Sequence, residues 1–429
     1  MMVFLKNLKE LSFLIYGLGI TGNSVLNFFK KNNIKNYKVW DDKKKHLYKN
    51  KRPNNLDEEL ANVDHIVLSP GVSLQNSKNK KKLIKYRNKI ITDLDLAFLF
   101  KRFYKSIVVT GTNGKSTTCK IINHLLNKNK FNSLLGGNIG TPVLNLKSSK
   151  KNFLIMEASS FQLAYSKFLK PDYAILLNIT NDHLDWHGSM KNYINSKFKI
   201  FTNQNQNQYS FINKKFKLNF YKRNLKSKLL IPEIQKYKKI KFKIKNSYLS
   251  LNINDENMSF VYSLSRVLKI NEKHFINALN SFQGLPHRYE IFLKKKNCIF
   301  INDSKATSFQ ATKYALQNTK NIYWIVGGLP KKNDKINVKD LKKNIIKSYI
   351  IGNHVNFFKK DLQSQIKICV TKNLKNSIKQ ILKDIKSYKK KQNIILFSPA
   401  AASFDQFLNF ERRGEEFKRL TKIYARKSI

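Results

Sequence analysis

Residues 107–117 read Ile-Val-Val-Thr-Gly-Thr-Asn-Gly-Lys-Ser-Thr, a β-branched run that enters a glycine-bearing turn. Apolar residues at three- and four-residue spacing follow over residues 121–126, which predicts an amphipathic helix. A strand, a turn and a helix in this order point backbone N–H groups at an anion, while Lys115 adds positive charge and Ser116 offers a hydroxyl to Mg²⁺. The strict phosphate-loop pattern has glycine where this chain has Val109, so the loop is a variant. We interpret it as a phosphate-binding loop, with a plain strand-to-helix turn as the alternative.

A second glycine-bearing turn lies near the N-terminus. An apolar strand leads into the pattern G-x-G-x-x-G over residues 17–22, and the next strand, Tyr37–Trp40, ends at Asp41, about 20 residues on. A third strand ends in Ser69-Pro70-Gly71. Such a βαβ unit places the glycines at a phosphate and the acidic residue at a ribose or base. The pattern suits a nicotinamide dinucleotide or a nucleotide sugar, and alone it does not separate the two.

Polar side chains follow strands in the rest of the chain as well. Phe153–Glu157 is an apolar strand that ends in a carboxylate, and a further apolar strand precedes Asp182 and His183. Because ligands bind at the carboxyl ends of strands in open α/β sheets, two such ends beside a phosphate loop favour Mg²⁺–ATP. Further along, the strand Cys298–Asn302 runs into a dense polar cluster, and later apolar strands complete a small sheet.

These strands predict three consecutive α/β domains. We expect a Rossmann-like N-terminal domain over 1–93, a P-loop-type central ATP-binding domain with a parallel sheet over 94–284, and a Rossmann-like C-terminal domain over 285–429. The second boundary falls at a segment that carries glycine and proline. Residues 203–250 are rich in Gln, Asn and Lys, and the alternation over 240–244 predicts short, half-exposed strands.

The composition limits the classes of protein that fit. The chain has 429 residues, a formal charge of +55 and three cysteines. The lysines are spread along the chain and do not form arginine-rich clusters with aromatic residues, so we interpret the charge as a bias of solvated faces and expect no nucleic-acid partner. The sequence has no run of about 18 apolar residues, so we expect no membrane span. Three widely spaced cysteines indicate reduced thiols in a cytoplasmic protein.

Six motifs resemble, in the same order, those of the Mur ligases. They are Thr110-Gly-Thr-Asn-Gly-Lys-Ser-Thr117, Gly137-Asn-Ile-Gly140, Glu157-x-Ser-Ser-Phe-Gln162, Asn178-x-Thr-x-Asp-His183, Gly284-Leu-Pro-His-Arg288 and Asn302-Asp-Ser-Lys-Ala-Thr307. The segment Ser398–Phe407 and the opening pattern over 17–22 resemble the branch of the family that adds D-glutamate. The resemblance covers nearly the whole chain and is weakest over 203–250. Two positions depart from the family: Ile253 stands where it has histidine, and Leu-Pro-Lys-Lys follows Gly328 where it has Asp-Gly-Lys.

The resemblance implies an ATP-driven ligase of peptidoglycan precursor synthesis, and hence a role in cell-wall biogenesis, cell shape and division. The L-alanyl carboxylate of UDP-N-acetylmuramoyl-L-alanine would attack the γ-phosphate of ATP, and the amine of D-glutamate would then attack the acyl phosphate. Cations must gather at that centre because carboxylate and triphosphate are both negative. Expected partners are therefore these three substrates with Mg²⁺, and we expect a monomer.

Roles for single residues follow from the same resemblance. The catalytic groups would be Lys115, His183 and Lys197, the last at the position of a carbamylated lysine, with Lys199 as its rival. ATP would contact Gly111, Thr112, Asn113, Gly114, Lys115, Ser116, Thr117, Asn257, Arg288, Asp303 and Lys305. The UDP-sugar would contact Gly19, Ile20, Thr21, Asp41, Ser69, Gly71, Asn138 and Gln162. D-Glutamate would contact Thr307, Lys331 (rival Lys332), Ser403, Phe404 and Phe410. Mg²⁺ would contact Ser116, Glu157, His183 and the Lys197 carbamate.

Other functions stay open at this point. The nearest is a sister ligase, or a folylpolyglutamate-type synthase, that adds a different amino acid. A nicotinamide-dependent dehydrogenase could use residues 11–42, but it leaves the phosphate loop unexplained. A basic nucleic-acid-binding ATPase predicts tight, salt-sensitive binding to DNA or RNA.

Overall fold

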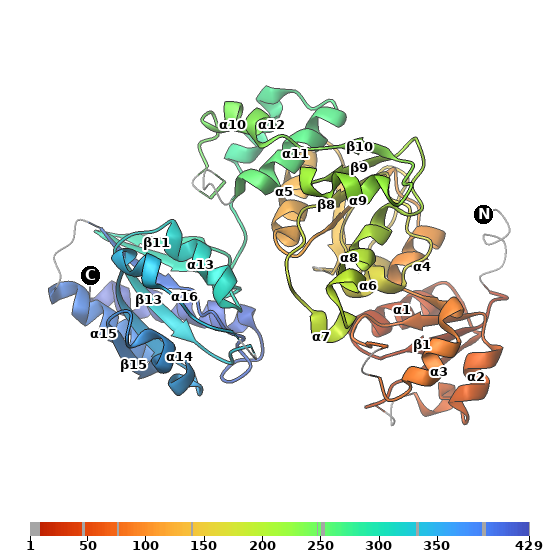
Figure 1. Cartoon of the computed structure of the whole chain (residues 1–429), viewed down its shortest axis with the longest axis horizontal. Helices are drawn as coiled ribbons and strands as arrows, with labels where there is room; N and C mark the ends of the chain where they lie inside the picture. The colour runs from red at the N-terminus through yellow and green to blue at the C-terminus, as the bar shows by residue number, and fades with distance from the viewer. Residues whose placement is uncertain are drawn as a thin grey trace. The chain divides into compact units, whose positions relative to one another are not determined.

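The computed structural model describes residues 9–44, 48–74, 77–138, 140–246, 248–249, 254–331, 334–387 and 392–428. The chain folds as two compact units, one formed by Met1–Asn246 with Asn254–Phe282 and the other by Ser247–Ile253 with Gln283–Ile429. Two sheets belong to the first unit and one to the second (Figure 1). Ile139, Ile253 and Lys332 lie outside the described residues.

The first sheet is parallel, with strand order β2-β1-β3-β4. Its strands are β1 (Phe13–Tyr16), β2 (Tyr37–Trp40), β3 (His65–Leu68) and β4 (Ile90–Ile91), and its helices are α1 (Ile20–Lys31), α2 (Leu56–Asn62), α3 (Lys80–Lys85) and α4 (Asp93–Phe100). All four residues of β1 are buried, as expected for a strand covered on both faces. Since β1 pairs with both β2 and β3, the glycine loop after it opens at the strand-order switch point.

The second sheet is also parallel and has the order β10-β9-β8-β5-β7-β6. Its strands are β5 (Lys105–Thr110), β6 (Ser133–Gly137), β7 (Phe153–Glu157), β8 (Tyr173–Leu176), β9 (Tyr209–Ile212) and β10 (Lys228–Leu230). Its helices are α5 (Lys115–Lys128), α6 (Ser160–Tyr165), α7 (Leu184–His187), α8 (Met190–Phe198), α9 (Lys217–Tyr221), α10 (Ile234–Lys241), α11 (Asp255–Val267) and α12 (Glu272–Asn280). The phosphate loop therefore joins the interior strand β5 to α5, which packs against α11 and α12.

The prediction of strands over 240–244 was wrong. Helix α10 runs through Lys241 and packs against α11, with Tyr237 and Ile240 buried. Ile244 is buried as well, so the buried apolar residues recur at three- and four-residue spacing, as in a helix. The alternation misled because it set Phe242, which is 78% exposed, beside residues that face the core.

The third sheet is mixed, with order β11-β12-β16-β13-β14-β15, and its edge strand β11 runs antiparallel to β12. Its strands are β11 (Glu290–Lys295), β12 (Cys298–Asn302), β13 (Ile322–Gly327), β14 (Ile345–Ile351), β15 (Ile368–Lys372) and β16 (Asn393–Phe397). Its helices are α13 (Phe309–Gln317), α14 (Val355–Leu362), α15 (Leu374–Ser387) and α16 (Phe410–Ser428). The predicted fold class, three α/β regions in a row, is confirmed. Within the described residues, no helix combines the length and apolarity needed to cross a membrane.

Candidate active site

The phosphate loop depends on Gly114, the residue that precedes α5. Its backbone is left-handed, with φ +83°, which glycine adopts without strain. A Cβ at this position would lie 2.5 Å from Oδ1 of Asn257, so the amide of Asn257 packs directly on the loop. The structure thus brings Asn257, from α11, to the N-terminus of α5, where the helix dipole and the N–H groups of the first turn favour an anion.

Asn178 holds the loop in place from the end of β8. Its Oδ1 accepts the N–H of Asn113 at 2.8 Å, its Nδ2 donates to the Asn113 carbonyl at 3.2 Å, and its own carbonyl accepts the N–H of Thr112 at 2.9 Å. The sequence analysis assigned no role to this side chain, although it opens one of the recognised motifs. A polar residue at the end of a buried strand is the signal that could have found it.

Glu157 joins two of the predicted site residues at the loop. Its Oε2 accepts the hydroxyl of Ser116 at 2.7 Å and its Oε1 accepts Nδ2 of Asn138 at 2.9 Å, and the carboxylate is almost fully buried. The described residues include no group of three or more His, Cys, Asp or Glu side chains placed to hold a metal. Mg²⁺ at nucleotide sites is bound by one or two protein oxygens together with substrate phosphates and water. Ser116 and Glu157 can supply the protein oxygens.

Two lysine amines meet on one carbonyl of the loop. Nζ of Lys115 donates to the carbonyls of Gly111 and Thr112, both at 2.9 Å, and Nζ of Lys197 donates to the same Gly111 carbonyl at 2.8 Å. Burial, then repulsion by Lys115, holds the pKa of Lys197 well below its usual range. Lys199, the rival residue, instead donates to the carbonyl of Ala164 at 2.6 Å. Lys197 is therefore the lysine at the loop.

Tyr193 supports Lys197 from the preceding turn of α8. The Lys197 Nζ lies 4.6 Å from the centroid of its ring, and its hydroxyl is 2.9 Å from Oγ1 of Thr112 in the loop. His183 precedes α7 with a left-handed backbone, φ +53°, and its ring lies against Phe161 with centroids 4.7 Å apart. Tyr193 was missed as a site residue, although its four-residue spacing from Lys197 on one helix places both side chains on one face.

The N-terminal glycine loop is also held in shape by its own chain. A Cβ on Gly22 would lie 1.9 Å from the Gly17 carbonyl, which also accepts the Ser69 hydroxyl at 2.7 Å. The carboxylate of Asp41 accepts the N–H of Leu18 at 2.6 Å, and backbone hydrogen bonds lower its pKa despite partial burial. Gly19, Ile20 and Gly71 are exposed and Thr21 is half-buried, so this end of the sheet is open to a ligand.

Gln162 does not have a free amide. Its Oε1 accepts both the N–H and the hydroxyl of Ser159, at 3.2 and 3.0 Å, and its Nε2 donates to both oxygens of Asp93 at 3.2 Å. Burial raises the pKa of Asp93 to about 6. The Gln162 amide therefore connects α6 to the start of α4, and its oxygen and nitrogen are both used in these hydrogen bonds.

In the second unit, most of the predicted residues follow the carboxyl ends of β12, β13 and β16, whereas Arg288 precedes β11 and Phe410 begins α16. Asp303 accepts the N–H of Tyr289 at 3.0 Å and the hydroxyl of Ser398 at 2.7 Å, and burial raises its pKa to about 6. Nζ of Lys305 lies 5.1 Å from the ring centroid of Phe410. The remaining predicted residues range from buried Ser403 and half-buried Arg288 and Thr307 to exposed Lys331 and Phe404.

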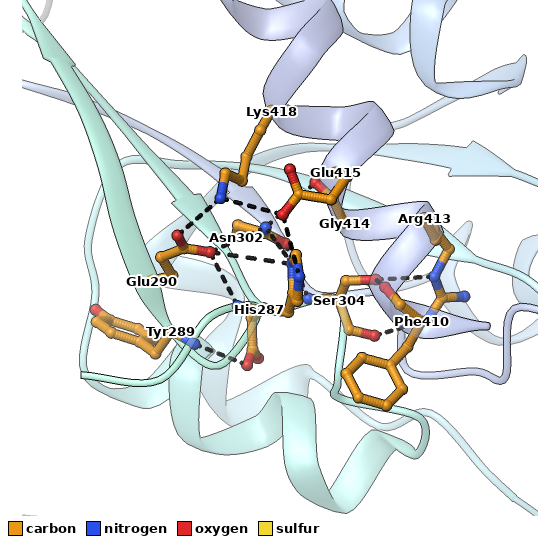
Figure 2. Close-up of polar contacts among 11 residues, drawn as sticks. His287, Tyr289, Glu290, Asn302, Ser304, Phe410, Arg413, Gly414, Glu415 and Lys418 are labelled. Atoms are coloured by element: carbon orange, nitrogen blue, oxygen red, sulfur yellow. Dashed lines mark hydrogen bonds and ion pairs between the residues drawn. The ribbon is translucent and has the colours of Figure 1, made fainter. Parts of the chain in front are cut away.

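His287 links the start of the second unit to α16 through contacts with Glu290, Asn302 and Glu415, which we call the His287 clasp (Figure 2). Its backbone is left-handed, with φ +61°, and its N–H donates to Oε2 of Glu290 at 2.9 Å. Nδ2 of Asn302 donates to the ring Nδ1 at 2.9 Å, which leaves the ring proton on Nε2, 3.3 Å from Oε1 of Glu415. The His287 carbonyl accepts the N–H of Lys305 at 3.0 Å, so the clasp shapes the β12 loop.

Gly414 makes the clasp testable, because a Cβ there would lie 2.2 Å from Nδ1 of His287. We expect Gly414→Ala to destabilise the wild-type chain by about 1–3 kcal/mol through overpacking. In a His287→Ala background the same change should stabilise by about 0.5–1 kcal/mol, since it removes a glycine from a helix. Thermal unfolding of the four variants measures this reversal of sign. An equal loss of Tm in both backgrounds would contradict the clasp.

Two family models and several curated proteins match this chain. Residues 109–279 match the model of the Mur ligase middle domain, and residues 12–86 match that of the Mur ligase MurD-like N-terminal domain. A UDP-N-acetylmuramoylalanine–D-glutamate ligase from Rickettsia felis is 35% identical over 448 residues, which span 96% of this chain and 97% of that protein. The enzyme of the same name from Buchnera aphidicola is 35% identical over 449 residues, 95% and 97% of the two chains.

Solved structures show the same fold at lower sequence identity. The MurF ligase of Thermotoga maritima, in complex with ADP, superposes with a TM-score of 0.57 at 17% identity and covers 97% of this chain and 99% of its own. The UDP-N-acetylmuramate–alanine ligase MurC of the same organism gives a TM-score of 0.56 at 16% identity, over 97% and 100% of the two chains.

Proposed function

Because this chain belongs to the Mur ligase family, we propose that it joins D-glutamate to UDP-N-acetylmuramoyl-L-alanine as ATP is cleaved to ADP and phosphate, in peptidoglycan precursor synthesis. The observation that carries this proposal is the meeting of Lys115 and Lys197 on one carbonyl of a phosphate loop. A carboxylate approaching a triphosphate needs positive charge at the reaction centre, and Lys115 supplies it at this loop. Similarity to relatives named for D-glutamate, over nearly the full length of both chains, supports the choice of amino acid.

The chain's own groups account for the chemistry. The backbone N–H groups of 111–117 hold the phosphates, and Lys115 offsets the charge that develops on the transferred γ-phosphate. The substrate carboxylate oxygen forms a bond to that phosphorus as ADP leaves, and the amine of D-glutamate then attacks the acyl carbon and expels phosphate. Ser116, Glu157 and His183 would hold Mg²⁺, which supplies further charge neutralisation when bound.

Lys197 is proposed to act as a carbamate. Its amine is buried, has a strongly lowered pKa and stands beside Lys115, and each of these features favours the neutral amine that reacts with CO₂. The product is an anion next to Lys115, where an unmodified second cation is unfavourable. In that form Lys197 would be a ligand for Mg²⁺ and would no longer compete with Lys115 for the Gly111 carbonyl.

The remaining assignments stay proposals on the family pattern. We assign 1–93 to the UDP-sugar, 94–284 to ATP and 285–429 to D-glutamate, with Arg288, Asp303 and Lys305 as nucleotide contacts. Thr307, Lys331, Ser403, Phe404 and Phe410 are the proposed D-glutamate contacts. We propose that the protein acts as a monomer in the cytoplasm, where its three free cysteines would stay reduced.

The test is phosphate release from ATP with UDP-N-acetylmuramoyl-L-alanine and a panel of amino acids. We expect D-glutamate to give turnover at least about tenfold above L-glutamate or L-lysine, because a specific site discriminates by more than 1 kcal/mol. Equal rates with all three amino acids would refute the choice of D-glutamate and favour a sister ligase. Phosphate release that depends on added DNA or RNA would instead support the nucleic-acid-binding ATPase.

A further inference from the structure

Arg413 is a buried cation of the second unit. It lies in the first turn and a half of α16 and is 1% exposed. Its Nε donates to the hydroxyl of Ser304 at 3.1 Å, and its Nη2 donates to the carbonyl of Ser304 at 2.8 Å (Figure 2). Nη2 also donates to the carbonyl of Ala401 at 3.0 Å. Among the described residues no carboxylate pairs with it, and its Nη1 is buried without a hydrogen-bond partner.

The position of the guanidinium connects it to a ligand-binding edge. Ser304 follows β12, Ala401 follows β16, and Gly328 follows β13, where an added Cβ would lie 3.1 Å from Nη1. The unpartnered nitrogen is therefore directed at the loop after β13. Ligands of open α/β sheets bind outside the carboxyl ends of parallel strands, and these are three adjacent strands of the sheet.

The charge of Arg413 is only partly compensated, because the acid that interacts with it lies beyond ion-pair distance. Burial lowers the pKa of Arg413 to about 10, so the guanidinium stays protonated at neutral pH. The acid that interacts with it is Asp405, whose Oδ2 also accepts the N–H of Asn353 at 3.1 Å. An anion that binds nearby stabilises a buried cation that lacks a close partner, because the protein interior screens their attraction less than water does.

Resting on the proposed function, we propose that Arg413 is a positioning residue that also sets specificity: it braces the loops after β12 and β16, and its charge favours an amino acid with a second carboxylate over a neutral analogue. The hydrogen bonds to Ser304 and Ala401 hold the two loops in position. The charge, which has no ion-pair partner among the described residues, attracts the second carboxylate of the amino acid.

The experiment compares D-glutamate with D-glutamine, which has the same shape but a neutral side chain. In the wild type we expect kcat/KM for D-glutamate to exceed that for D-glutamine by at least about a hundredfold. Arg413→Met and Arg413→Gln should reduce this ratio by about tenfold or more, since each removes a unit charge. Arg413→Lys should keep the ratio within about threefold while it lowers kcat/KM for both, because lysine retains the charge and loses the forked hydrogen bonds.

Arg419→Met is the matched control, because Arg419 lies on the same helix but is 60% exposed and pairs with Glu416. It should leave both rates and the ratio unchanged. A purely structural Arg413 would lower both rates in Arg413→Met or Arg413→Gln and leave the ratio at its wild-type value, which would overturn the inference. Loss of the ratio in Arg413→Lys would overturn it too. A wild type that does not use D-glutamate would instead refute the proposed function, so the two failures are distinguishable.

Discussion

Replacing Lys115 with alanine is expected to lower kcat about a thousandfold or more, with a much smaller change in the unfolding temperature. The Lys115 Nζ donates to the carbonyls of Gly111 and Thr112, so its charge is held at the phosphate loop. Removing a single preorganised group that stabilises developing charge costs about 10²–10³ in kcat, and in phosphoryl transfer the charge on the γ-phosphate makes the loss larger. Phosphate release under saturating substrates measures the effect.

Lys128 provides the control for Lys115. It lies in the last turn of the same helix and is exposed. Its replacement by alanine removes the same formal charge as Lys115→Ala. Lys128→Ala should keep kcat within about twofold, since exposed charges at a distance are screened. Lys115→Arg should recover part of the activity, because it keeps the charge but changes the donor geometry. A near-normal kcat for Lys115→Ala would remove the phosphate loop from the mechanism.

The parts of the site that the sequence predicted are those encoded by neighbouring residues. A strand, a glycine turn and a helix start within eleven residues, so the position of Lys115 at a helix N-terminus follows from local spacing. The glycine loop over 17–22 is local in the same way. Both loops were predicted as phosphate sites, and both have the backbone that the pattern requires, with left-handed glycines at Gly17 and Gly114.

The parts that the sequence did not predict depend on partners far along the chain. Asn178 supports a loop 65 residues away, and Arg413 reaches Ser304 across 109 residues. Spacing alone gives no information about such partners. One sign was nevertheless visible: Arg413 shares a helix face with Phe417 and Leu420, both buried, so the apolar stripe of α16 includes an arginine. A charge in an apolar stripe indicates a buried ion that needs a reason.

The choice between Lys197 and Lys199 shows what the structure adds to the sequence. Both residues lie near the end of α8, two positions apart, and in the sequence only the register of the motif separates Lys197, the preferred residue, from Lys199. In the structure the two side chains leave the chain in different directions, one to Gly111 and the other to Ala164. Side chains two residues apart on a helix do not share a face, so one register fits the loop and the other does not.

Lys197→Ala is expected to lower kcat by about 10²–10³-fold, because it removes the anion proposed beside Lys115 and Mg²⁺. Short carboxylic acids such as acetate or propionate should restore part of the activity, since the deleted side chain leaves room for a free carboxylate at the carbamate position. Lys199→Ala, which removes an amine that serves the Ala164 carbonyl, should lose far less activity and gain nothing from added acid. Equal rescue of the two variants would refute the assignment of Lys197.

The wild type offers an independent test, because the carbamate forms reversibly from CO₂ and the neutral amine, with release of one proton. The lowered pKa of Lys197, caused by burial and by Lys115, increases the fraction of neutral amine that can react with CO₂, and protonation as the pH falls should drive CO₂ off. Enzyme depleted of CO₂ at mildly acidic pH should therefore lose activity and recover it when bicarbonate is added at neutral pH. Lys197→Ala rescued by acetate should not respond to bicarbonate. If depletion leaves the wild-type rate unchanged, Lys197 acts as the free amine that donates to Gly111, and its role is to hold the loop.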